Sequence, residues 1–274
     1  MVYGIIRLIN FAHGDFIMVG GYTLYFTVPI LLHGMGLPAW TGVLAAIVIC
    51  ALVGVVVELV AYRPVRRKGT SMSALITAIA MSLLLENLAQ AIPAMGPNPR
   101  VISDEIFSTA PISIGGVSVN MAAVVTIIIA AVVMAALQLF VQKTKLGRAM
   151  RAVSENKEAS TLVGINVNRT IVTTFAIGSG LAAVAALMYC AQYHTVTTTM
   201  GSMLGLKAFV AAVMGGIGLI PGAMLGGIVV GIIEALVTAY ISSSLANAVV
   251  FLILIVMLLV KPAGILGKNV GEKV

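Results

Sequence analysis

Long stretches of this chain carry no lysine, arginine, aspartate or glutamate, and these stretches constrain the fold most. An uncharged apolar segment of about 20 residues can cross the roughly 30 Å hydrocarbon layer of a membrane as an α-helix. Strands of a membrane barrel would instead alternate apolar and polar residues, and these stretches do not. They predict an all-α, polytopic helical membrane protein. The stretches are Ala39–Val57, Met121–Gln142, Thr170–Tyr193 and Ala208–Ile233.

The hydrophobic segments predict about seven to eight transmembrane passes within a single membrane domain, residues 1–274. One of them, 205–217, is short and rich in glycine, so the sequence leaves open whether it crosses the membrane or re-enters. The main loop on one side is 93–120, and the main loop on the other is 143–169. The expected passes lie at about 15–32, 39–61, 71–92, 119–142, 170–191, 205–217, 219–240 and 246–261.

The distribution of charge predicts an orientation. The chain is 60% hydrophobic and 9% charged, with a net charge of +7. All lysines and arginines except Arg100 and Lys207 fall on one side of the predicted topology. The positive-inside rule places that side, with loop 143–169, in the cytoplasm of a cell bounded by a plasma membrane. The positive charge is therefore a sign of membrane orientation, and no nucleic acid partner is expected.

Loop 143–169 is unusually polar for this chain and contains a predicted helix. Ser154 can cap its start, and Glu155 and Glu158 place acidic groups in the first turn. Gly164 can end it as the residue after the C-cap. On these residues alone, a solvated connector between two spans is the simpler interpretation, and a docking helix is the alternative.

Glycines between 215 and 231 do not form a nucleotide site. The third position of a dinucleotide-binding pattern is occupied by Pro221, and no GxxxxGK[ST] sequence occurs in the chain. The spacing of Gly218, Gly222 and Gly226 instead predicts close helix packing in the membrane. Cys50 and Cys190 lie in apolar runs and are expected to be inert thiols. No metal or other cofactor is expected.

The segment INFAHGDF, residues 9–16, places polar groups at the start of the first clear span. Asn10, His13 and Asp15 are candidate gating or pathway residues. The alternative is that Asp15 only caps the helix that follows. His13 and Asp15 do not share a helix face, which disfavours a catalytic or metal-binding pair.

Three further carboxylates lie in or next to apolar runs, where ionisable groups are costly. Glu58 is near a predicted membrane boundary and close to Arg63, so it is expected to reach the surface. Glu86 and Glu234 lie deeper. A proton relay is one interpretation of the deeper pair, and hydrogen-bonded contacts between helices are the simpler one.

An ordered set of five motifs, spread from Val2 to Leu266, resembles the H-type membrane permease of branched-chain amino acid ABC importers. This resemblance covers nearly the whole chain. The motifs are INFAHGDF, AYRPVR, GRAMRAVSENKEASTLVGINVNR, LKAFVAAVMGGIGLIPGAMLGG and KPAGILG.

The resemblance implies a function. It predicts a permease subunit of an ATP-driven importer of leucine, isoleucine and valine in the bacterial plasma (inner) membrane, forming half of a translocation pathway with alternating access. The implied partners are a second, M-type permease, two cytosolic ATPase subunits that bind the ATP, and a periplasmic or extracellular substrate-binding protein. The implied short cytosolic coupling helix, which docks on an ATPase, includes Glu155, Glu158, Ala159, Ser160 and Gly164.

Other functions remain open at this point. A permease for urea or short-chain amides resembles the chain equally in its visible motifs. An ion-coupled secondary carrier would require midplane carboxylates such as Glu86 and Glu234, and a membrane enzyme would require a nucleophile–base pair that the sequence does not show. Members of the family usually begin with one more apolar helix, so we expect roughly 30 residues, enough for one span and its flanks, to precede Met1.

Overall fold

The computed structural model describes residues 2, 4, 10–102, 112–114 and 117–267. Within this part of the chain, seven helices are long and apolar enough to cross a membrane. The predicted polytopic helical fold is therefore confirmed. The first span contains η1 (Phe11–His13), α2 (Asp15–Pro29) and π-helical η2 (Ile30–Gly34). The second contains α3 (Trp40–Val57), which continues into π-helical η3 (Glu58–Tyr62) and α4 (Arg63–Lys68). The third and fourth are α5 (Ser71–Ala91) and α6 (Met121–Lys143).

The second half of the chain supplies the remaining spans and a helical loop. The loop contains α7 (Lys145–Glu155) and α8 (Lys157–Leu162), and the spans are α9 (Val167–Tyr193), α11 (Ile220–Tyr240) and α12 (Ser243–Val260). Between α9 and α11 lies the shorter helix α10 (Met200–Gly215).

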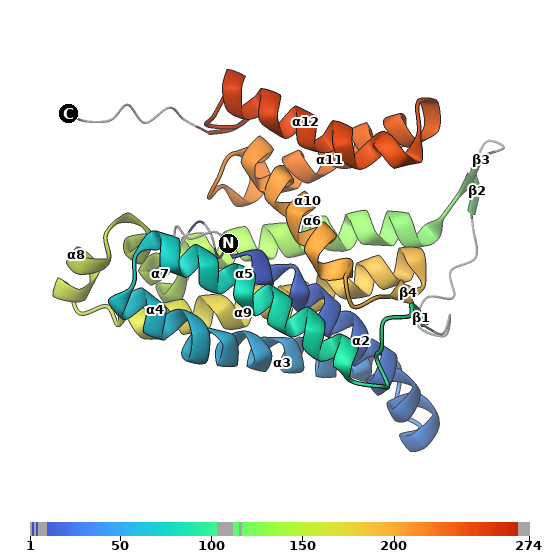
Figure 1. Cartoon of the computed structure of the whole chain (residues 1–274), viewed down its shortest axis with the longest axis horizontal. Helices are drawn as coiled ribbons and strands as arrows, with labels where there is room; N and C mark the ends of the chain where they lie inside the picture. Colours follow the sequence, from blue (N-terminus) through green and yellow to red (C-terminus); the bar gives the residue numbers. More distant parts are fainter. Residues whose placement is uncertain (1, 3, 5–9, 103–111, 115–116, 268–274) are drawn as a thin grey trace.

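Helix α9 lies in the centre of the bundle and packs on α2 and α3 (Figure 1). Small residues allow this close approach: a Cβ on Gly20 of α2 would lie 2.9 Å from the Cα of Ala183. Leu24 and Val28 of α2 are buried in the same contact, against Cys50 of α3. This three-helix core positions the start of α2 against the rest of the bundle.

Helix α10 packs mainly on α11 and α2. It begins just after β4 (Thr195–Val196), and its last residues meet the segment that follows α12. There the Ile265 amide donates to the Met214 carbonyl at 2.7 Å. Residues 205–215 therefore belong to a helix of 16 residues, which is shorter than the seven helices that are long enough to cross a membrane.

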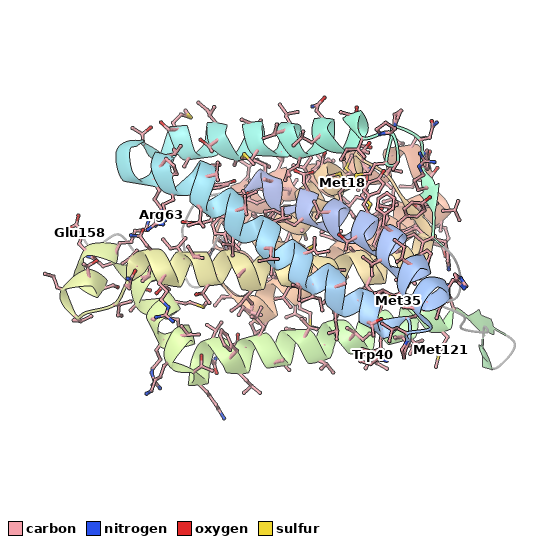
Figure 2. All side chains as sticks on the ribbon, turned by 90° about the horizontal axis from the view of Figure 1, so that it is seen from below. Met18, Met35, Trp40, Arg63, Met121 and Glu158 are labelled. Carbon is pink, nitrogen blue, oxygen red and sulfur yellow. The ribbon has the colours of Figure 1, made fainter. Side chains whose placement is uncertain are left out.

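Four short strands lie at one end, which we call the strand end (Figure 1). β1 (Arg100–Val101) pairs antiparallel with β4, and β2 (Ile112–Ile114) pairs antiparallel with β3 (Val117–Val119). The loop acids Asp104 and Glu105 lie outside the described residues. The opposite end carries α4, α7 and α8, and we call it the α8 end. Figure 2 shows Arg63 and Glu158 at this end, and Met35, Trp40 and Met121 at the other.

The outer surface of the bundle is apolar. Large hydrophobic side chains are exposed on several spans, among them Leu52, Leu83, Ile127, Leu236 and Leu259. Such a surface would aggregate in water, whereas lipid tails solvate it without cost. The exposed apolar surface thus agrees with a bilayer environment.

Candidate functional site

The α7–α8 segment protrudes at the α8 end (Figure 1). Thr144 caps α7 by accepting from the Gly147 amide, and Asn156 caps α8 by accepting from the Ala159 amide at 3.0 Å. The prediction that Ser154 caps the loop helix was wrong. Its hydroxyl donates to the Arg151 carbonyl instead, because the chain forms two helices with a break at Asn156.

The end of α8 has a fixed geometry. Gly164 has a φ of +84°, the left-handed conformation expected of the residue after a C-cap, and its amide donates to Thr161. Glu158 points away from the bundle (Figure 2). Leu162 and Val163 are 88% and 75% exposed. Two apolar side chains therefore stand at the tip of a polar loop, a feature that sequence reasoning missed.

Of the other loop residues that were predicted to contact an ATPase, some are exposed and one is buried. Glu155 and Ala159 are exposed, whereas Ser160 is buried and donates its hydroxyl to the Asn156 carbonyl at 2.7 Å. Ser160 therefore acts within the loop, and the surface open to a partner consists of the other residues.

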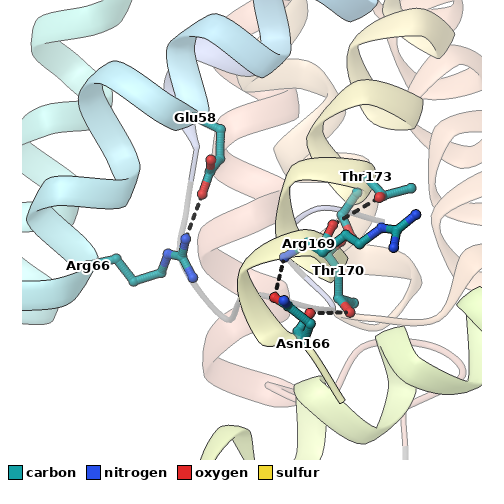
Figure 3. Close-up of polar contacts among 7 residues, drawn as sticks. Glu58, Arg66, Asn166, Arg169, Thr170 and Thr173 are labelled. Atoms are coloured by element: carbon teal, nitrogen blue, oxygen red, sulfur yellow. Dashed lines mark hydrogen bonds and ion pairs between the residues drawn. The ribbon is translucent and has the colours of Figure 1, made fainter. Parts of the chain in front are cut away.

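Close to this loop, a buried ion pair fixes the end of α3 (Figure 3). Glu58 is fully buried and accepts from Arg66 at 2.5 Å. The prediction that Glu58 reaches the membrane surface was therefore wrong. Figure 3 also shows Asn166 at the start of α9, where its side chain accepts from the Arg169 amide at 3.0 Å. The ion pair joins η3 to α4, and the Asn166 side chain caps the start of α9.

The segment before α2 places three polar side chains inside the bundle. The Asn10 side-chain oxygen accepts from the Tyr62 hydroxyl at 2.5 Å. His13 lies edge-on to Phe16 and close to Gly178 of α9. Asp15 is fully buried, and neither of its carboxylate oxygens has a hydrogen-bond donor among the described residues. Asp15 lies in the first turn of α2, as the capping alternative expects, but its side chain makes no capping hydrogen bond. The structure buries Asp15 fully and Asn10 and His13 partly, and all three lie close to the start of α2.

Two deeper carboxylates are hydrogen-bonded contacts between helices, as the simpler interpretation expects. Glu86 of α5 accepts from the Ser202 hydroxyl of α10. Glu234 of α11 accepts from Lys207 of α10 at 2.6 Å. Since both partners lie on α10, this helix connects α5 to the α11–α12 pair by polar contacts that the sequence did not indicate.

Glycines hold α10 and α11 at close distance. A Cβ on Gly226 would overlap the Ala211 carbonyl, and a Cβ on Gly222 would overlap the Gly215 carbonyl. Gly218 differs, because it precedes α11 and lies in the turn between the helices with a φ of +90°. The α10–α11 contact therefore involves Gly222 and Gly226, and Gly218 acts in the turn.

Comparison with known proteins identifies the type of molecule that contains these features. A family model described as the permease component of branched-chain amino acid transport systems matches residues 1–260. The chain belongs to this family. The predicted family resemblance is thus confirmed, and it extends across all the helices described above.

Individual relatives in this permease family cover the same length. The high-affinity branched-chain amino acid transport system permease protein BraD of Pseudomonas aeruginosa is 39% identical over all of this chain and 91% of its own length. The corresponding LivH protein of Escherichia coli K12 is 41% identical over all of this chain and 90% of its own. A probable LivH of Methanocaldococcus jannaschii is 27% identical over 79% of this chain. No solved structure matches the chain.

Proposed function

We propose that this chain is the permease subunit of an ATP-driven importer of leucine, isoleucine and valine. The observation that carries the proposal is the full-length similarity to branched-chain amino acid permeases, which covers 100% of this chain. In this function the chain forms half of a translocation pathway in a bacterial plasma membrane, and a second, M-type permease forms the other half.

Energy for transport has to come from other subunits, because the sequence contains no P-loop motif. The α7–α8 loop is the surface that best fits a cytosolic ATPase. It presents Glu158 beside Leu162 and Val163, and exposed apolar groups on a polar loop are typical of protein contacts. The fixed ends of α8 allow the loop to transmit ATPase closure to the spans as a rigid-body shift. Substrate is delivered at the strand end by a binding protein.

Orientation is tested by thiol labelling. We expect Lys157→Cys at the α8 end to resist a membrane-impermeant thiol reagent in intact cells, and Asn98→Cys at the strand end to react. The basis is the positive-inside rule, since α4, α7 and α8 carry eight of the 16 lysines and arginines. Cys50 and Cys190 are fully buried, so the native background is low. Both engineered thiols should react in permeabilised cells, and a reversed pattern in intact cells would contradict the orientation.

The substrate is tested by reconstitution. The chain is co-expressed with the permease, ATPase and binding-protein subunits encoded beside it, and the complex is placed in liposomes with ATP. We expect ATP-dependent uptake of labelled leucine and no uptake of labelled urea. Uptake of urea without uptake of leucine would instead identify the chain as a permease for urea or short-chain amides. Leucine uptake without ATP, driven by an ion gradient, would contradict the ABC mechanism.

A further inference from the structure

Asp15 requires a hydrogen-bond donor that the described chain does not supply. Its side chain is fully buried, no described residue donates a well-formed hydrogen bond to either carboxylate oxygen, and the Ser82 hydroxyl of α5 lies nearby. Burying a carboxylate without a donor costs several kcal/mol. A ligand that brings a donor to this carboxylate would therefore lower the cost of burying it.

A second carboxylate lies beside it. A Cβ on Gly201 of α10 would lie 2.6 Å from Oδ1 of Asp15, and the next residue, Ser202, donates to Glu86. One turn of α10 thus brings Asp15 of α2 and Glu86 of α5 together, close enough for electrostatic interaction. Two like charges in a medium of low dielectric constant repel each other unless a cation lies between them.

The α5 surface next to this pair is polar. Ser82, Glu86 and Gln90 are four residues apart and share one helix face. Glu86 is partly exposed, and Asn87 and Gln90 are exposed. Polar groups at membrane depth face protein or a water-filled cavity and avoid lipid. The face of α5 that carries Glu86 is therefore suited to line an aqueous pathway.

We propose that Asp15 and Glu86, held together by Gly201 and Ser202 of α10, bind the α-ammonium group of the amino acid during translocation. This proposal rests on the proposed function. An ammonium group offers three N–H donors, which match the two oxygens of Asp15 and one of Glu86.

The surroundings also suit the rest of the substrate. Leu85 and Leu204, which are only partly buried, lie at the adjoining apolar cluster and can contact a branched aliphatic side chain. A carboxylate pair beside an apolar surface matches a molecule with a cationic group and a hydrocarbon branch.

The first test uses the assembled importer in liposomes. Asp15→Asn and Glu86→Gln should each lower ATP-dependent leucine uptake by about tenfold or more, the loss expected for a hydrogen bond to a charged group. ATP hydrolysis stimulated by the loaded binding protein should persist, because the ATPase-facing loop is unchanged. Glu86→Asp should restore much of the uptake. Leu83→Ala, at an exposed apolar position of α5, is the control and should stay close to wild type.

The second test does not depend on transport. Ser82→Cys is treated with a cationic and an anionic methanethiosulfonate reagent of similar size. We expect the cationic reagent to react about tenfold faster, a preference of about 1.4 kcal/mol, because two carboxylates attract it. Adding Asp15→Asn should reduce that preference. Equal rates in Ser82→Cys alone would overturn the proposal, even if the double variant assembled poorly.

The outcomes separate the two proposals. If the wild-type complex imports no branched-chain amino acid, the proposed function is wrong. If the wild type imports leucine but Asp15→Asn and Glu86→Gln do so equally well, the function stands and the ammonium subsite is wrong. If leucine uptake by the wild type requires Na⁺, the carboxylate pair binds an inorganic cation, and the proposed ammonium subsite is wrong.

Discussion

Gly226→Leu should prevent stable packing of α10 against α11. A Cβ at this position would overlap the Ala211 carbonyl and lie 2.9 Å from the Gly215 amide nitrogen, and both are backbone atoms that cannot move alone. We expect a loss of about 3 kcal/mol or more, at the upper end of overpacking effects, because the helices must separate. The measurement is the amount of monodisperse complex after detergent extraction, together with its thermal stability.

Gly231→Leu is the matched control. It lies on the same helix, but a Cβ there has no atom within 4 Å. We expect the control to extract and melt like the wild type. If both leucine variants behave alike, the close contact at Gly226 is not what holds α10 and α11 together.

Changes on the α7–α8 loop should abolish coupled transport while the protein remains in the membrane. Leu162→Asp places a charge on a side chain that is 88% exposed, and it should weaken apolar contact with the ATPase without touching a span. Glu158→Lys reverses an exposed charge on the same loop. We expect leucine uptake and binding-protein-stimulated ATP hydrolysis to fall together. Near-normal stimulation in both variants would make the loop a solvated connector.

Gly164→Val tests whether the geometry of the loop matters as well as its surface. Its φ of +84° makes a β-branched residue costly by about 1–2 kcal/mol. Gly36→Val is the matched control for strain, since Gly36 has a φ of +64° and neither glycine has an atom within 4 Å of a built Cβ. Both variants should reach the membrane at similar levels. Only Gly164→Val should reduce the amount of ATPase subunit that co-purifies with the permease.

Local chemistry explains which parts of the fold the sequence predicted well. Spans such as Met121–Lys143 and Val167–Tyr193 are uncharged over about the thickness of the hydrocarbon layer, so their positions follow from solvation alone. The left-handed backbone conformation of Gly164 was also predictable, because this glycine follows the last turn of a short polar helix. The start of α10 at Met200 was not predictable, since the threonines before it are compatible with either a helix or a turn.

The interior of the candidate site depends on contacts between distant segments. Asp15 meets Gly201, and Glu86 meets Ser202, only because α2, α5 and α10 pack together. No periodicity within one segment encodes such a meeting. The pairing of Glu58 with Arg66 was missed for a related reason: the π-helical segment η3 begins at Glu58 and changes the angle between the two side chains from that expected for an α-helix.

The small pairing of β1 with β4 has a mechanical consequence. Its register joins Arg100 to Val196 and Val101 to Thr195, and the Ile102 amide donates to the His194 carbonyl at 3.0 Å. The strands follow α5 and precede α10, so they tie together the outer ends of the two helices that carry Glu86 and Ser202. We therefore expect a protein that binds at the strand end to affect α5 and α10 together, and through them the contact between Glu86 and Ser202.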